Sequence, residues 1–213
     1  VLVAQQKQVT NFSLLAGNKV VPPALHALLA QPELGIDALL LPGHVSAVIG
    51  TEPYKFIPRD YGIPCVVAGF EPGDIVIAVK ELLDMIRDNR CEVKNCYERV
   101  VRDCGNEKAR TVMDTVFEPV DDTWRGFGLI ASSGLGLRPE YSEFDVCAKL
   151  GMSVPDGHDP PGCRCGDVVR GLIDPNECGL FGTVCTPDQP VGPCMVSSEG
   201  TCAAHFKYGS GTV

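Results

Sequence analysis

The stretch IPCVVAGFEPGDIVIAVKELLDMIRDNR, residues 63–90, decides the fold class of this chain. Its first part, residues 63–70, is a short apolar run that ends at Gly and Phe, which is typical of a buried strand. Its second part, residues 71–90, repeats apolar residues at helical spacing and predicts a helix with charged residues on the other side. The predicted apolar positions are Ile75, Val76, Val79, Leu82, Leu83 and Ile86.

The segments on both sides continue this alternation of strands and helices. Residues 9–17 and 36–43 predict strands, and residues 22–31, which begin with Pro, predict a helix between them. A further helix is expected over 106–117 with Asn106 as its N-cap, and the Gly-rich segment 121–137 predicts strand and turns. Such alternation predicts an α/β fold with a Rossmann-like, largely parallel sheet over residues 1–150.

A boundary is predicted over residues 151–162, GMSVPDGHDPPG, because this segment holds three Pro and three Gly. The next forty residues are rich in cysteine, so we expect a second, small and loop-rich domain over 151–213. The cysteines of this segment are Cys163, Cys165, Cys178, Cys185, Cys194 and Cys202.

Composition and charge exclude several classes of protein. Apolar residues make up 45% of the 213 residues and charged residues 21%, close to the globular average. The formal charge of −9 would repel a phosphate backbone, so nucleic acid is not an expected partner. No apolar run reaches the roughly 20 residues that span a bilayer. The start of the chain lacks a signal peptide, which predicts a cytoplasmic protein, and the missing initiator Met suggests a fragment.

The cysteine-rich segment is compatible with disulfide bonds, a zinc site or an iron–sulfur cluster. Disulfide staples are disfavoured, since a chain with a full apolar core does not need them and no export signal is seen. The close C-x2-C pairs typical of structural zinc are absent. An iron–sulfur cluster needs four thiolates from loops and tolerates wide spacing; two thiols would remain as buried bystanders or as a redox pair. The other cysteines, Cys65, Cys91, Cys96, Cys104 and Cys147, show no framework spacing.

The order of motifs over nearly all of the chain resembles the HypD family of [NiFe]-hydrogenase maturation proteins. The similar blocks are NFSLLAGNKVVPPALHALL, PGHVSAVIG, VVAGFEPGDI, NCYERVVRDCGN, WRGFGLIASSGL, CRCGDVVRG and CGLFGTVCTPDQPVGPCMVSSEGTCAAHFKY. The family holds a [4Fe-4S] cluster through a C-x14-C-x6-C-x16-C pattern. The resemblance therefore implies that Cys163, Cys178, Cys185 and Cys202 are the ligands, and that Cys165 and Cys194 form a redox-active thiol pair beside the cluster.

The same resemblance implies a function. Members of this family act with HypC as a scaffold on which an iron acquires two cyanides and one carbon monoxide, giving the Fe(CN)2CO group, with cyanide delivered by HypE and electrons supplied by the cluster and thiols. Such a protein is a maturation factor more than a turnover enzyme. The family's CGTH and GPGCPVC blocks have no counterpart here. A cluster-fed thiol–disulfide oxidoreductase and a structural zinc-binding interaction module remain as alternatives.

Two further motifs with candidate residues follow predicted strands, at the sheet end where α/β proteins gather ligands. A lone His such as His44 in PGHVS is more often structural, but the resemblance implies a place in the interdomain cleft. Glu71 and Asp74 in GFEPGD either favour the helix N-terminus or take part in cleft chemistry.

Overall fold

The computed structural model describes residues 1–124, 126–152 and 160–209, and the chain forms two compact units. The first unit comprises Val1–Pro22, Asp37–Val120 and Ser132–Ser153, and the second comprises Pro23–Ile36, Asp121–Ala131 and Val154–Val213. Most of the predicted boundary segment, residues 153–159, lies outside the described residues.

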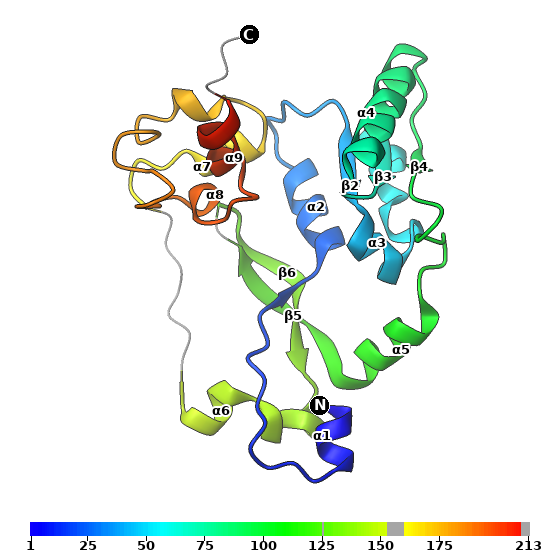
Figure 1. Cartoon of the computed structure of the whole chain (residues 1–213), viewed down its shortest axis with the longest axis vertical. Helices are drawn as coiled ribbons and strands as arrows, with labels where there is room; N and C mark the ends of the chain where they lie inside the picture. The colour runs from blue at the N-terminus through cyan, green and yellow to red at the C-terminus, as the bar shows by residue number, and fades with distance from the viewer. Residues whose placement is uncertain (125, 153–159, 210–213) are drawn as a thin grey trace. The chain divides into compact units, whose positions relative to one another are not determined.

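A three-stranded parallel sheet forms the centre of the first unit. Its strands are β2 (Leu39–Pro42), β3 (Cys65–Ala68) and β4 (Val93–Asn95), in the order β2-β3-β4. Every residue of β3 is buried, as expected for a central strand covered on both faces. Helix α3 (Gly43–Ile49) follows β2, and α4 (Pro72–Arg87) follows β3 and packs on the sheet (Figure 1). The predicted α/β class with a parallel sheet is confirmed.

Helix α4 was predicted correctly in extent, but its packed face was not. Asp74, Ala78, Leu82 and Met85 are buried, and the last three pack against β3, whereas four of the six predicted apolar positions are exposed. These four are Val76, Val79, Leu83 and Ile86. A methyl side chain at position 78 permits close approach to the sheet, and Asp74 is paired by Arg99, so a small and a charged residue occupy the inner face.

The predicted strand over residues 9–17 is wrong. This segment makes one isolated bridge, Leu14 with Asp145, and the strand β1 (Asn18–Lys19) comes only after it. The amide of Leu14 donates to the carbonyl of Phe144, and the amide of Val146 donates to the carbonyl of Leu14. The bridging residue Asp145 lies at the junction between two helical segments. Residues 9–17 therefore have no neighbouring strand there with which to form a longer β-ladder.

The other predicted elements of the first two-thirds are confirmed. Helix α2 spans Val21–Leu29 and α5 spans Glu107–Val116, with the Asn106 side chain accepting from the amide of Ala109 at 3.0 Å. The Gly-rich segment contributes to a second sheet of order β1-β6-β5, in which β6 is antiparallel to β1. Its longer strands are β5 (Phe117–Trp124) and β6 (Gly128–Leu137).

Short helices and loops make up the cysteine-rich part of the second unit (Figure 1). They are α7 (Cys165–Val169), the 3-10 turn η4 (Pro175–Glu177), α8 (Pro193–Val196) and α9 (Thr201–Tyr208). Their core consists of Val168, Cys185, Met195, Cys202 and Ala203. The segment Pro23–Ile36 joins this unit, since the amide of Gly35 donates to the carbonyl of Arg170 at 2.8 Å.

The remaining elements are short. They are α1 (Leu2–Gln6), η1 (Glu52–Tyr54), η2 (Ile57–Tyr61), η3 (Pro139–Phe144) and α6 (Val146–Leu150). Among the described residues, no helix has the length and apolar character needed to cross a membrane.

Candidate metal centre and thiol pair

All six cysteines of the C-terminal segment line a single cavity of about 20 Å³ in the second unit. Four other residues complete its wall: Leu180, Phe181, Gly192 and Met195. The sulfurs thus meet in a small apolar enclosure, although their cysteines are spread over forty residues.

Local backbone structure holds four of these cysteines in place. The amide of Cys163 donates to the Pro160 carbonyl just before α7, and the amide of Cys178 donates to the Pro175 carbonyl as η4 ends. The amide of Cys185 donates to the carbonyl of Leu180 at 2.9 Å, closing a tight turn. Cys202 lies in the first turn of α9. The loops predicted from the Gly and Pro content are therefore short, hydrogen-bonded turns.

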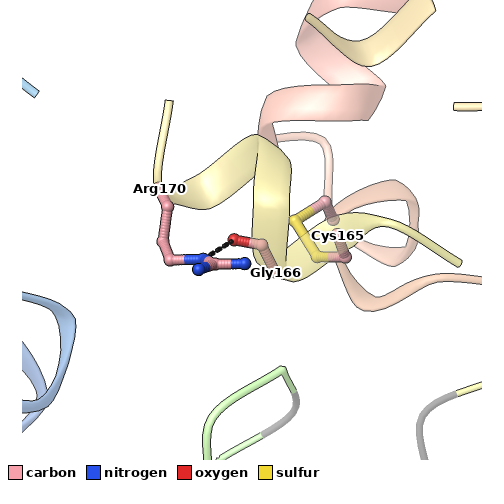
Figure 2. Close-up of a disulfide and its surroundings, with 4 residues drawn as sticks. Cys165, Gly166 and Arg170 are labelled. Atoms are coloured by element: carbon pink, nitrogen blue, oxygen red, sulfur yellow. Dashed lines mark hydrogen bonds between the residues drawn. A yellow bond between two sulfur atoms is a disulfide. The ribbon is translucent and has the colours of Figure 1, made fainter. Parts of the chain in front are cut away.

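Cys165 and Cys194 form a disulfide that joins α7 to α8, with their Cα atoms 6.2 Å apart (Figure 2). The other four cysteines of the cavity are not disulfide-bonded. Geometry thus separates the six sulfurs into a bonded pair and a set of four thiols. The roles that the family resemblance implies, cluster ligands for the four thiols and redox activity for the pair, stay predictions.

The neighbouring thiols affect the thiol of Cys202. Burial first, and then the neighbouring Cys178, Cys185 and Cys163, together raise the pKa of the Cys202 thiol to about 11. The cavity wall holds sulfur donors and no carboxylate or imidazole among its described residues, which suits soft metals such as iron in clusters or zinc. Within the described parts of the chain, no three Cys, His, Asp or Glu side chains are grouped so as to hold a single metal ion.

Two neighbouring residues contact the thiol set in ways that sequence reasoning missed. The amide of Val191 donates to Cys185 Sγ at 3.4 Å. The α-carbon of Gly192 lies so near Cys163 that an added β-carbon would stand 2.5 Å from its sulfur. No pattern of residue types marks a backbone donor, but the Pro-Val-Gly-Pro-Cys sequence before Cys194 signals a rigid turn.

A partly open polar pocket of about 160 Å³ adjoins Cys163 and Cys165. Its wall consists of Gly126, Cys163, Arg164, Cys165, Gly166 and Asp167. Asp167 forms ion pairs with Arg164, at 2.8 Å, and with Arg170. The hydrogen bonds from these two arginines lower the pKa of the Asp167 carboxyl, and the bond from Arg164 has the largest effect. Arg170 also donates from Nε to the carbonyl of Gly166 at 3.2 Å (Figure 2).

The two predicted cleft residues lie in the first unit, at the carboxyl ends of adjacent strands. His44 opens α3 after β2, and its ring lies 4.4 Å from that of Phe70, which follows β3. Glu71 holds the N-cap position of α4 without a side-chain capping bond, and its side chain is 81% exposed. His44 is also exposed, at the rim of an apolar pocket of about 420 Å³ that includes Val45, Val48 and Met113.

Asp74 has a structural role that its place in GFEPGD alone did not reveal. Arg99, which follows β4, donates to both carboxylate oxygens of Asp74 at 2.7 and 2.6 Å and lies over the Tyr97 ring at 4.5 Å. The Arg99 hydrogen bonds lower the pKa of the Asp74 carboxyl. The turns after β3 and β4 are tied together by this pair.

The five cysteines outside the segment do not join the cavity. Burial, and to a smaller degree Cys91, raises the pKa of the Cys65 thiol to about 12, as expected for an inert thiol in a core strand. Cys91 and Cys104 are exposed, and Cys96 and Cys147 are partly buried.

Comparison with known proteins identifies the family. The family model HypD, described as the hydrogenase formation hypA family, matches residues 1–209. The hydrogenase maturation factors HypD of Escherichia coli and of Rhizobium leguminosarum bv. viciae are each 44% identical over 206 residues, which cover 96% and 93% of this chain and 55% and 54% of those proteins. HypD2 of Bradyrhizobium diazoefficiens is 42% identical over 214 residues, covering 97% of this chain and 56% of the relative.

The chain therefore spans just over half the length of these curated relatives. The match runs through both units and includes all six cysteines of the cavity. The chain belongs to the HypD family of hydrogenase maturation factors.

Proposed function

We propose that this chain provides the redox-active part of a scaffold on which the Fe(CN)2CO group of [NiFe] hydrogenase is assembled. One observation carries the proposal: four thiols and one disulfide line the same small cavity. Thiols alone would be typical of a metal site, and a disulfide alone would be typical of a structural cross-link. Their combination in one enclosure supports electron exchange between a metal group and a thiol pair.

The four thiols match the donor chemistry of a [4Fe-4S] cluster. They provide an all-sulfur donor set from separate loops, and the amide of Val191 already donates to one of the sulfurs, as is common around iron–sulfur ligands. In this proposal Cys163, Cys178, Cys185 and Cys202 hold the cluster, which when bound supplies electrons one at a time. Four thiolates around one zinc ion would stand only about 3.8 Å apart at ~2.3 Å Zn–S bonds, a convergence for which the side chains are not grouped.

The chemistry of the thiol pair balances as a two-electron step. Reduction breaks the Cys165–Cys194 bond, takes up two electrons and two protons, and leaves two thiols. When the disulfide forms again, the two electrons and the two protons are released. The polar pocket beside Cys165 offers a way in for an external thiol or protein partner. This pocket is also the observation that favours the second candidate, a thiol–disulfide oxidoreductase fed by the same cluster.

Partners are part of the proposal. We expect the complete scaffold to work with HypC and to receive cyanide from HypE. His44 and Glu71 are expected to lie near the place where the iron receives its ligands. The chain spans only about half the length of its relatives, and the iron under construction is the cargo of the scaffold, for which this chain is not proposed to supply a ligand. Copurification of this chain with tagged HypC, and then with HypE, tests this part directly.

The central experiment is anaerobic reconstitution with iron and sulfide, followed by metal analysis and visible and EPR spectra. Wild-type protein and the control Cys104→Ala, which changes an exposed thiol outside the cavity, should hold iron and a dithionite-sensitive chromophore. Cys178→Ala should lose the cluster, whereas Cys165→Ser should keep it and lose the two-electron thiol couple. Protein that binds zinc and no iron, or a Cys178→Ala variant with a full cluster, would refute the assignment. Turnover of a generic disulfide substrate would favour the oxidoreductase.

A further inference from the structure

We infer that Val191 and Gly192 are positioning residues for the thiol set, each placing one ligand sulfur. Val191 acts through its backbone N–H on Cys185, and Gly192 acts through its missing side chain on Cys163. The inference rests on the proposed cluster, and it assigns a role to residues that carry no metal-binding group of their own.

Gly192 is required for space and not for backbone conformation. Its φ of −88° and ψ of 153° are ordinary extended values that alanine adopts without strain. An added β-carbon would nevertheless stand 2.5 Å from Cys163 Sγ, far inside the ~3.5–4.0 Å of normal contact. The nearest obstacle is a cysteine sulfur, so any larger residue here would push the thiol of Cys163 from its place in the cavity.

Val191 supplies a directed donor to a second sulfur. Its amide lies 3.4 Å from Cys185 Sγ, and the loop that carries it is anchored by reciprocal backbone bonds between Thr186 and Gln189 at 3.2 and 3.1 Å. Hydrogen bonds to ligand sulfurs stabilise added negative charge and are one of the means by which proteins set the reduction potential of a cluster. Loss of this N–H should make the cluster harder to reduce.

The placement of this dipeptide ties the two parts of the centre together. It contacts sulfurs from two different loops, and Cys194, two residues beyond Gly192, closes the disulfide with Cys165. The dipeptide is held rigid between Pro190 and Pro193. It therefore positions the sulfurs of two proposed ligands and lies directly before Cys194 of the thiol pair.

Gly192→Ala tests the steric role, with Gly179→Ala as its matched control. Gly179 adjoins the ligand Cys178, but an added β-carbon there meets nothing within 4 Å. After reconstitution, iron loss to a ferrous chelator should be roughly 10-fold faster in Gly192→Ala and unchanged in Gly179→Ala. Circular dichroism spectra that match the wild type exclude misfolding as the cause.

Val191→Pro tests the donor, because proline removes the N–H, and Val191→Ala is the control that keeps it. Potentiometric titration followed by EPR should give a more negative midpoint potential for Val191→Pro and an unchanged one for Val191→Ala. A Gly192→Ala protein that retains iron like the wild type, or two Val191 variants that shift equally, would overturn the inference while the cluster stands. A wild-type protein that takes up no iron would overturn the proposed cluster itself.

Discussion

Leu82 and Leu83 are adjacent on helix α4 and chemically identical, yet the structure predicts very different consequences of truncating them. Leu82 is 8% exposed and packs in the core cluster of β3 and α4, whereas Leu83 is 62% exposed. We predict that Leu82→Ala lowers the free energy of unfolding of the first unit by about 2–5 kcal/mol, through lost burial and the cavity left behind. Leu83→Ala should cost less than about 1 kcal/mol, because most of its side chain is already in water.

The assay needs a local probe, since the chain has two compact units that need not unfold together. Hydrogen exchange of the β3 amides reports on the sheet that Leu82 covers. A loss of about 3 kcal/mol corresponds to a protection factor roughly 100-fold lower under equilibrium exchange, and Leu83→Ala should leave it within a few-fold of wild type. Equal losses for the two variants, or a Leu82→Ala protein with unchanged protection, would refute the packing of α4 described above.

Three further predictions concern the first unit. Gly50→Ala should cost more than about 2 kcal/mol in denaturant titration, because Gly50 has φ +83° and an added β-carbon would stand 2.1 Å from the Asp103 carbonyl oxygen; stability near wild type would contradict the close turn. Asn106→Ala should lower the stability of α5 by about 1 kcal/mol, measured by exchange of its first-turn amides, while an unchanged rate would argue against the cap. The Asp74–Arg99 pair lowers the folded-state pKa of Asp74, so its contribution is present above the unfolded pKa of about 3.9 and is lost as pH falls through the lower folded value. The difference in melting temperature between wild type and Asp74→Asn should therefore shrink from pH 6 towards pH 3, and a constant difference would show that the charge of Asp74 plays no part.

Helix α4 shows how far periodicity reaches. The 3.6-residue repeat predicted a helix over 71–90, and a helix is found over Pro72–Arg87. The repeat could not select the packed face, because apolar residues extend around more of the helix than one sheet contact covers. The packed face is determined by Ala78, which is small enough for close approach to the sheet, and by Asp74, whose charge is paired by Arg99 from a different turn.

The segment over 9–17 shows a different limit. Its residues have the composition of a strand, but a strand exists only where another strand offers donors and acceptors. Leu14 meets the junction between η3 and α6, which provides partners for one residue. The residues of segment 9–17 cannot indicate this partner, because the partner residues lie more than 120 positions further along the sequence.

For the candidate site, the sequence by itself determined the inventory: six cysteines in loop-forming surroundings, in motifs that resemble those of the HypD family. Cysteine type and interval are properties of the chain, so they can be read without coordinates. Only the tertiary structure decided that all six sulfurs line one cavity, that Cys165 and Cys194 are close enough to bond, and that Val191 and Gly192 lie against the thiols of Cys185 and Cys163. The physical reason is that a backbone N–H and a missing β-carbon act only through distance, and distance between remote residues is set by folding.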